Sequence, residues 1–575
     1  MKLLTGAAYA ALFFASLSIA HGDHESMDMD TDIDIHATSS TPAPTASASQ
    51  NTQSYFSYGQ HSGTILAHIA LMTLSWCFVL PAAVLLSIGR SHLALPSQFL
   101  FLVVNGLGLV FGIVYNSQTP DLYENNAHHK IGWIVTWVVS VQVILAVIFA
   151  HAGRGESKQS QSRSFDCAAF LPVATDEHEY RDVHEYCSDH EYSQETEVGS
   201  SSIRSPLSSS YESQAECDEK SKEELQGWFY SSIIDRVLLK CLSNRVLRIF
   251  NGLYDVIDRI ILPFGFIAIA TGAVTYGGLF HGIEIFNGLA HFIKGGIFFW
   301  YGILTLSRFI GAWADLGWAW NRKPPACVVS SGWKAKVPSG EFVESFVIWL
   351  YGVTNVFLEH LAGWGKPWTA NDLEHVSISV MFFGGGLVGM LFESRSIRDA
   401  LNNTIFSLRS SPTSVYDDHD DRFEDENWQP PQSQGVPLNP MPALIILLLG
   451  MIMGSHHQDS MTSTMVHKQW GNMLVGFAIA RAMTYFLLFL RPPTSYLPAR
   501  PPTEIVAGFC LMSGGLIFML SARDVIEAME FYELDAMFTF TVGMGFTAFI
   551  MSLVVLAIAI KAWAVKRERL LSMKR

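Results

Sequence analysis

The chain has 575 residues, of which 49% are hydrophobic and only 15% are charged, a composition too apolar for an ordinary soluble protein. Its formal net charge is −15, but three hydrophilic stretches, residues 21–36, 152–228 and 413–427, hold 30 of the 52 acids, and the rest of the chain is net positive. The basic residues border apolar segments and form no long stripe, so we expect no nucleic-acid partner.

The first 20 residues have the pattern of a secretory signal peptide. They carry one basic residue, a short apolar run and Ser18-Ile19-Ala20, which predicts cleavage after Ala20. An uncut signal anchor is the alternative, although the apolar run is shorter than the roughly 20 residues that a span requires. Residues 21–60 are acidic and then rich in Ser, Thr, Ala and Pro, which predicts a disordered lumenal or extracellular tail.

Apolar stretches of span length occur eleven times after the signal, so the predicted fold is all-α, a polytopic transmembrane helix bundle. The stretches are residues 64–88, 98–116, 131–151, 257–280, 285–307, 342–362, 375–393, 441–457, 468–490, 504–521 and 536–560.

Two hydrophilic stretches divide the membrane part into residues 61–151, 257–395 and 440–575. Residues 152–256 are predicted to be a cytosolic acidic loop that ends, at 230–256, in a basic amphipathic helix on the inner membrane face. Residues 396–439 are predicted to be a second cytosolic acidic loop.

Orientation follows from the basic residues. An outside N-terminus and eleven crossings place the basic C-terminal tail inside, together with most basic residues of the short loops. Five cysteines also fall inside and none falls outside, which agrees with that assignment. We therefore expect a membrane protein of the secretory pathway with a lumenal or extracellular N-terminus and a cytosolic C-terminus.

Histidines gather on one side of the membrane in this orientation. Ten lie at the outer side, namely His68, His128, His129, His281, His291, His360, His375, His456, His457 and His467. Imidazole is the usual protein ligand of haem iron, copper and zinc, so the layer predicts a redox or metal site in the outer leaflet.

Charged residues inside spans are functional candidates, because each needs a partner or a wet cavity. In the fifth span, Glu284, Asn287, His291 and Lys294 share one helical face, and Lys294 lies roughly 15 Å into the span. Arg481 lies in the middle of the ninth span. Each cation could face an anionic cofactor group, and the alternative is a structural ion pair between two spans.

Further metal donors occur where spans meet the outer side. Two Glu-His pairs face one loop, and a second group combines imidazoles with nearby methionines; the donors are Glu359, His360, Glu374, His375, His456, His457 and His467. Such donors suit copper or another divalent metal. Ordinary polar residues at span ends are the alternative.

The first three spans resemble the cytochrome b561 module of membrane redox proteins. Thr64-Ile65-Leu66-Ala67-His68 resembles its first core helix, and His128-His129-Lys130-Ile131-Gly132 its third. The resemblance implies one haem b with His68 and His128 as axial ligands and His129 as a fallback. Phe101 stands where the second core helix would offer histidine, so the resemblance also implies loss of the inner-leaflet haem and argues against electron transfer across the whole bilayer.

The chain as a whole resembles the fungal Ytp family of integral membrane proteins. Residues 286–295, Phe-Asn-Gly-Leu-Ala-His-Phe-Ile-Lys-Gly, and Gly317-Trp318-Ala319-Trp320-Asn321 carry this resemblance. It implies a b561-like N-terminal module followed by a fungus-specific C-terminal module.

The leading hypothesis is a membrane redox protein, an oxidoreductase or electron carrier, with one outer-leaflet haem. The alternative is a metal-ion or proton transporter in which Lys294, Arg481, His291 and the Glu-His pairs line a cavity. A non-catalytic membrane scaffold is the third hypothesis. The lipid bilayer is the one partner that the sequence identifies; it names neither an electron donor, nor a substrate, nor an oligomeric state.

Overall fold

The structure is a computed structural model of the chain. It describes residues 54–156, 244–282, 284–325, 334, 336–358, 367–403, 431, 435–456, 458 and 460–574. The expected signal peptide, most of the tail and most of both acidic loops lie outside the described residues, as do Glu359, His360 and His457.

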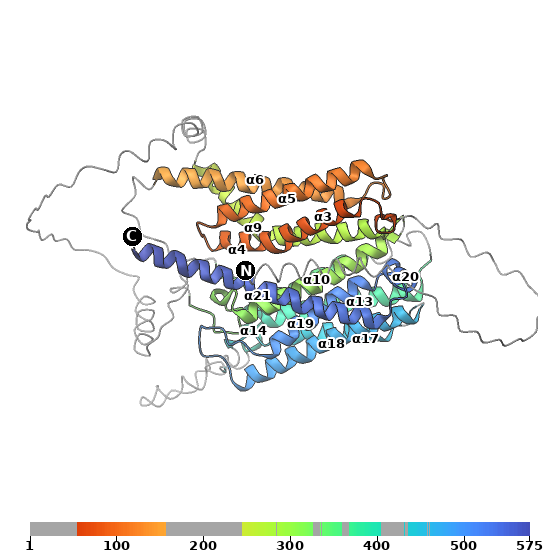
Figure 1. Cartoon of the computed structure of the whole chain (residues 1–575). Helices are drawn as coiled ribbons and strands as arrows, with labels where there is room; N and C mark the ends of the chain where they lie inside the picture. Colours follow the sequence, from red (N-terminus) through yellow and green to blue (C-terminus); the bar gives the residue numbers. More distant parts are fainter. Residues whose placement is uncertain are drawn as a thin grey trace, which may run out of the picture. The chain divides into compact units, whose positions relative to one another are not determined.

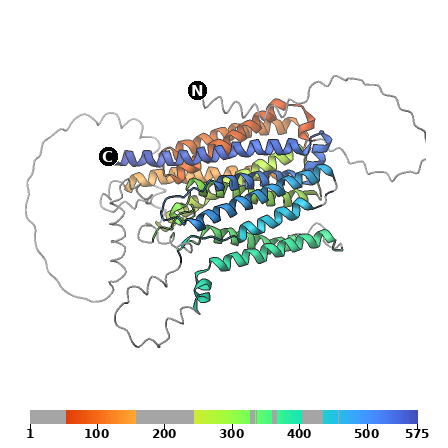
Figure 2. The same ribbon diagram turned by 90° about the horizontal axis from the view of Figure 1, so that it is seen from below.

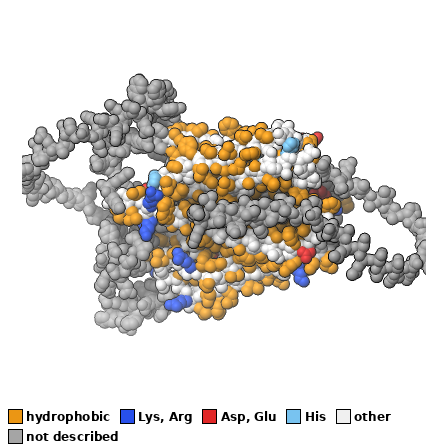
Figure 3. Space-filling view, in the orientation of Figure 1, with side chains coloured by type: hydrophobic (Ala, Val, Ile, Leu, Met, Phe, Trp, Pro, Cys, Tyr) orange, Lys and Arg blue, Asp and Glu red, His pale blue; other side chains and the backbone are white. Residues whose placement is uncertain are grey.

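Helices are the regular secondary structure of the described residues, which contain no strand. Nine of their helices are long and apolar enough to cross a membrane. The two remaining expected stretches coincide with α12 (Gly340–Leu358), which has 19 residues, and α17 (Met441–Ser455), which has 15. Figure 3 shows hydrophobic side chains over most of the described surface in that view, as expected of helices surrounded by lipid.

Two compact units make up the fold. Unit 1 holds the described residues up to Ala150, then Ile249–Leu279, then those from Ile560 on. Unit 2 holds Phe280–Ala559, and the division also assigns to it the described residues of His151–Arg248. The last helix, α21 (Ala536–Lys574), contributes to both units.

Unit 1 is a bundle built from four membrane helices (Figure 1). They are the continuous helix formed by α3 (Ser62–Thr73), the π-helical turn η1 (Leu74–Val79) and α4 (Leu80–Ile88), then α5 (Ala94–Gln118), α6 (Ala127–Glu156) and α9 (Asn244–Gly277). Its core contains Trp76, Phe101, Val139 and Ile261, one side chain from each helix.

Helix α9 corrects one expected boundary. It runs from Asn244 through Gly277 without a break, with Pro263 inside it. The described residues 244–256 are therefore part of the membrane-crossing helix and do not form a separate surface helix that ends at 256. The basic amphipathic pattern and the apolar pattern join because no helix-breaking residue separates them.

Unit 2 contains α10 (Glu284–Ile310), α12, α13 (Ala370–Glu393), α17, α18 (Met461–Leu490) and α19 (Thr503–Leu520). Helix α10 packs along α19, α19 along α18, α18 along α17, α17 along α13, and α13 along α12, and Figures 1 and 2 show these helices lying alongside one another. This succession of neighbours leaves α10 and α12 at its two ends, without extended packing between their backbones.

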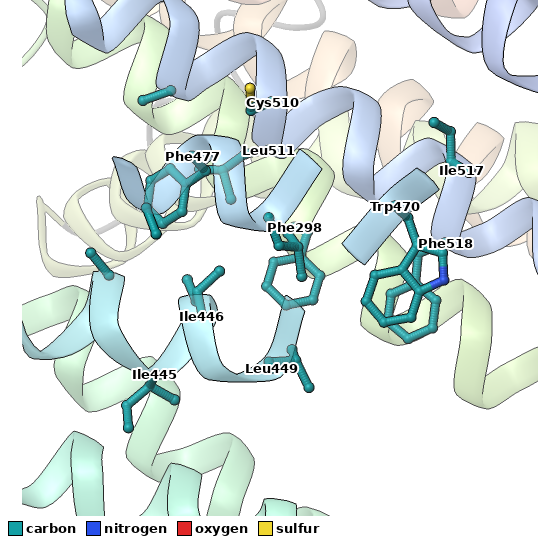
Figure 4. Close-up of a cluster of buried hydrophobic side chains, with 14 of the residues drawn as sticks. Phe298, Ile445, Ile446, Leu449, Trp470, Phe477, Cys510, Leu511, Ile517 and Phe518 are labelled. Atoms are coloured by element: carbon teal, nitrogen blue, oxygen red, sulfur yellow. The ribbon is translucent and has the colours of Figure 1, made fainter. Parts of the chain in front are cut away.

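The core of unit 2 is aromatic where α18 meets α19. The rings of Trp470 and Phe518 stack with centroids 4.2 Å apart and an interplanar angle of 13°, and Figure 4 shows them overlapping. Phe298, Ile446 and Leu449 extend this cluster onto α10 and α17.

Glycines bring α10 and α19 into close contact. A Cβ on Gly295 would lie 2.6 Å from the Gly515 carbonyl oxygen, and one on Gly302 would lie 2.9 Å from the Gly508 carbonyl oxygen. Within each helix the two glycines are seven residues apart, so they fall on one face. Such small residues allow the dispersion contacts that drive helix association in lipid.

Substitution of Gly515 by alanine should therefore destabilise unit 2, because the new methyl group would overlap the α10 backbone. We expect Gly515→Ala to lower the free energy of unfolding by about 1–3 kcal/mol, the usual cost of overpacking. The measurement is the thermal unfolding midpoint in detergent. Gly545→Ala is the matched control, since a Cβ at Gly545 would have no neighbour within 4 Å. Equal midpoints for the two variants would contradict the close contact.

Candidate functional site

The imidazoles of His68 and His128 lie next to each other in unit 1. Their ring centroids are 6.3 Å apart and the ring planes are inclined by 80°. The Nδ1 of His68 lies 2.8 Å from the Gly108 carbonyl oxygen on α5, and the Nδ1 of His128 lies 3.1 Å from the Ala268 carbonyl oxygen on α9. A proton on Nδ1 satisfies each carbonyl and leaves each Nε2 with a lone pair for a metal.

Two glycines allow this placement. A Cβ on Gly112 would lie 2.8 Å from the His68 Nδ1, and one on Gly272 would lie 3.0 Å from the His128 Cε1. Each imidazole therefore rests directly against the backbone of a neighbouring helix. His129, the expected fallback, is exposed, and its backbone N–H donates to the Asn126 Oδ1.

In the other half of unit 1, buried polar side chains form hydrogen bonds that involve no histidine. The Trp76 indole N–H donates to the Asn105 Oδ1 at 2.9 Å, beside the buried ring of Phe101. Further along the bundle, the Asp258 carboxylate accepts from the Ser87 hydroxyl at 2.6 Å and from the Gln142 amide. Packing and polar contacts thus occupy the region where a second pair of histidines would be needed.

Four described histidines of unit 2 lie in two pairs near one end of the helices. His291 and His467 have ring centroids 6.4 Å apart, as do His375 and His456, and the His456 Nδ1 lies 3.2 Å from the Glu374 Oε2. Among the described residues, however, no three His, Cys, Asp or Glu side chains group closely enough to hold a metal ion. The other expected donors, Glu359, His360 and His457, lie outside that set.

Buried charges meet near the opposite end of unit 2, where α10 and α18 end and α12 and α19 begin. Arg308 contacts the Glu341 Oε1 at 2.7 Å and the Glu344 Oε1 at 2.5 Å. Arg481 contacts the Glu344 Oε2 at 3.1 Å and the Glu504 Oε1 at 3.0 Å. All five side chains are at most 2% exposed. They form the buried charge cluster, with Glu344 bridging the two arginines.

The loop after α10 covers this cluster. The Trp318 carbonyl oxygen accepts from the Arg308 Nε at 2.7 Å, and the Trp320 ring lies 4.2 Å from the Arg308 guanidinium carbon and 4.9 Å from that of Arg481. Asn321 donates to the carbonyl oxygens of Ala314 and Tyr496. The Trp-Ala-Trp-Asn motif therefore provides hydrogen-bond and cation–π partners to buried cations.

Arg481 was expected to need an anionic partner, and its partners are carboxylates of this chain. The sequence interpretation missed Arg308, Glu341, Glu344 and Glu504. Each lies at or next to the end of an apolar stretch, where charges are ordinary and give no signal. The signal that could have found two of them is the spacing of Glu341 and Glu344, which are three residues apart and so lie on one helical face.

A cavity with a volume of about 360 Å³ lies inside unit 2. Lys294 and His375 line it near one end, and Glu344 of the buried charge cluster lines it near the other. Arg481 and His291 are not among its lining residues. Of the residues that the sequence predicted around a transport cavity, Lys294 and His375 therefore line this one, whereas Arg481 and His291 do not.

The helices and their apolar surfaces define a polytopic α-helical membrane protein. A family model described as "Protein YTP1-like, C-terminal" matches residues 264–562, and a model described as "Domain of unknown function (DUF2427)" matches residues 49–152. The chain therefore belongs to the YTP1-like family, as its sequence motifs predicted. No solved structure matches it.

Relatives in two yeasts support this membership. The chain is 32% identical over 516 residues to an uncharacterized membrane protein of Schizosaccharomyces pombe, an alignment that covers 89% of this chain and 96% of that protein. It is 37% identical over 345 residues to an uncharacterized membrane protein of Saccharomyces cerevisiae, covering 58% of this chain and 50% of that protein. It is also 26% identical over 182 residues to Protein YTP1 of Saccharomyces cerevisiae, covering 32% and 30% respectively.

Removal of one arginine from the buried charge cluster should be strongly destabilising, because carboxylates would stay buried without a counter-charge. We expect Arg481→Met to lower the free energy of unfolding by about 3–5 kcal/mol. Unfolding in detergent, followed by heat or denaturant, measures the change. The matched control is Arg523→Met, which removes a pair with Glu527 that is 62% and 61% exposed and should cost well under about 1 kcal/mol. Similar losses in both variants would show that the cluster does not stabilise the fold.

Proposed function

We propose that this protein is a membrane haem protein that carries electrons near one surface of the bilayer, with His68 and His128 as the haem ligands. The observation that carries the proposal is the 6.3 Å separation of the two imidazole centroids. At this separation both imidazoles could hold one metal-centred group.

The number of donors favours haem over a bare metal ion. Zinc takes three or four protein ligands, whereas haem iron needs only the axial ones, because the porphyrin supplies four nitrogens. The described residues offer the His68–His128 pair but no group of three or more donors suited to a metal ion. The chemistry of the donor set in unit 1 therefore fits haem.

The residues around the pair have definite tasks in this proposal. The carbonyls of Gly108 and Ala268 hold the Nδ1 protons, so both rings present Nε2 without rotating. Gly112 and Gly272 keep the rings against α5 and α9. A haem held by both imidazoles would supply one-electron transfer.

A single haem is proposed, because aromatic and hydrogen-bonded polar side chains stand where unit 1 would need a second pair of histidines. Phe101 and the Trp76–Asn105 hydrogen bond occupy the helix positions beyond the imidazoles. Electrons would therefore enter and leave at the same membrane surface.

The proposed topology has eleven crossings, a cleaved signal peptide, an outside N-terminus and a cytosolic C-terminus. Helix α12 is acceptable as a crossing helix because Arg308 and Arg481 neutralise its buried carboxylates. In this topology the His68–His128 pair lies in the outer leaflet, in a membrane of the secretory pathway.

A metal-ion or proton transporter is the second hypothesis from the sequence. The cavity in unit 2 is lined by Lys294 and His375, which favours it, but Arg481 and His291, which the hypothesis also places around the cavity, do not line it. We therefore favour the electron carrier.

Optical spectra test the haem ligands. Purified protein should show a Soret band and sharp visible bands on reduction, and His68→Ala and His128→Ala should each abolish or shift them, because each variant removes one of the two ligands of the haem iron. His129→Ala is the matched control and should keep the wild-type spectrum, since His129 is exposed beside the pair. Unchanged spectra in the two ligand variants would exclude these residues as ligands.

A further inference from the structure

Four helices of unit 1 bring polar side chains to one carboxyl group, that of Asp258 on α9. The Ser87 hydroxyl on α4 lies 2.6 Å from the Asp258 Oδ2, and the Gln142 amide on α6 donates to the Oδ1. The Tyr254 oxygen lies 2.9 Å from the Ser87 oxygen and accepts from the Gln98 amide on α5 at 2.8 Å. Tyr254, Ser87 and Asp258 therefore form a hydrogen-bonded row, which we call the hydroxyl row.

The carboxyl group at the end of this row is buried among neutral groups. Asp258 is 3% exposed. Among the described residues, the partners that α4, α5 and α6 contribute to the row are one hydroxyl and two amides. The charged groups that act on Asp258 are Asp255 and Arg259 of its own helix, and Tyr254 is the titratable group in the row. Asp255 and Arg259 are both exposed, and the Arg259 guanidinium donates to the Asp255 carbonyl oxygen.

Buried carboxylates of unit 2 have different partners. Glu341, Glu344 and Glu504 each contact an arginine at 3.1 Å or less. The side chains that contact the Asp258 carboxyl oxygens, those of Ser87 and Gln142, supply no positive charge. An ionised carboxylate that is buried without a counter-charge costs so much free energy that the group binds a proton instead.

The Gln98 amide indicates where the hydroxyl row meets water. Gln98 is 4% exposed, and its Oε1 is buried without a hydrogen-bond partner. Ordered water normally satisfies a buried acceptor of this kind. The two hydroxyl groups next to it belong to Tyr254 and Ser87, which are only half-buried, and Ser87 lies one residue before the end of α4. The row therefore leads from the buried carboxyl group towards the end of the bundle.

We propose that Asp258 is a proton-binding site, whose carboxyl group carries a proton at neutral pH and exchanges it with water through the hydroxyl row. Each hydroxyl group both donates and accepts, so the row can be polarised in either direction. When a hydronium ion gives a proton to the Tyr254 oxygen, the Tyr254 proton passes to Ser87 and the Ser87 proton passes to the Asp258 Oδ2. The hydronium ion becomes water, the carboxylate becomes an uncharged acid, and the reverse sequence releases the proton.

This proton site is separate from the histidine pair. Ser87 follows His68 by 19 residues in the continuous helix formed by α3, η1 and α4, which at 1.5 Å per residue is roughly 28 Å. The proposal therefore does not depend on haem binding.

Infrared spectra of the full chain in phosphatidylcholine nanodiscs test the protonation state. At neutral pH the wild type should show the C=O stretching band of an uncharged carboxylic acid, above the amide I band, and the band should move to lower frequency in D₂O. Asp258→Asn should lack this band, because it replaces the acid by an amide of the same shape. Asp255→Asn is the matched control and should keep the band, since Asp255 is exposed one turn away on the same helix.

Isotope labelling makes the same assignment without any variant. Aspartate labelled with carbon-13 in its side-chain carboxyl group should lower the frequency of the band, and labelled glutamate should leave it unchanged. A wild-type spectrum without such a band, or a band that Asp255→Asn removes and Asp258→Asn keeps, would overturn the proposal. His68→Ala should keep the band, so failure here and failure of the haem proposal are distinguishable.

The rate at which the band shifts after transfer to D₂O tests the route. Ser87→Ala should slow this exchange at least about tenfold, because it removes the hydroxyl that links Tyr254 to the carboxyl group. Ser140→Ala is the matched control and should exchange as the wild type does, since the Ser140 hydroxyl donates to the Thr136 carbonyl oxygen of its own helix. Equal exchange rates in Ser87→Ala and the wild type would show that protons do not travel along the hydroxyl row.

Discussion

Arg308 and Arg481 are the two cations on which unit 2 depends. In lipid no water is present to solvate a charge, so each buried guanidinium must find its partners within the protein. Glu341 and Glu344 come from α12, Glu504 comes from α19, and Trp318 and Trp320 come from the loop after α10. The cluster therefore joins helices that are far apart in the sequence, and it bridges α10 and α12, whose backbones have no extended packing.

That bridge also explains why a cavity can exist beside it. Side chains of the buried charge cluster hold α10 and α12 together near one end, while Lys294 and His375 line the space between the helices near the other. Glycine contacts fasten the opposite face of α10 to α19. Unit 2 thus combines one tightly packed helix pair with one pair joined mainly through charges, and the difference leaves room for the cavity.

The sequence predicted the all-helical class, the nine described membrane helices and the family. These features can be read from the sequence because long apolar runs and local motifs lie within short segments of the chain. The resemblance to cytochrome b561 also named His68 and His128, whose rings do lie together. The sequence could not show which polar side chains meet across helices, since that depends on helix rotation and packing. Arg481 was recognised because it lies mid-span, whereas Glu341 and Glu504 were missed because they lie at span ends. The sequence interpretation divided the chain at residue 256, whereas α9 runs from Asn244 to Gly277. No helix-breaking residue stands at the expected division.

The central claim is that two imidazoles, each fixed through Nδ1 by a carbonyl of a neighbouring helix, hold one haem in unit 1. The most direct measurement is the molar ratio of extracted haem, zinc and copper to polypeptide in protein purified without added metal. The account predicts one haem per chain and no stoichiometric zinc or copper. A folded preparation that contains zinc or copper in stoichiometric amount and no haem would contradict it.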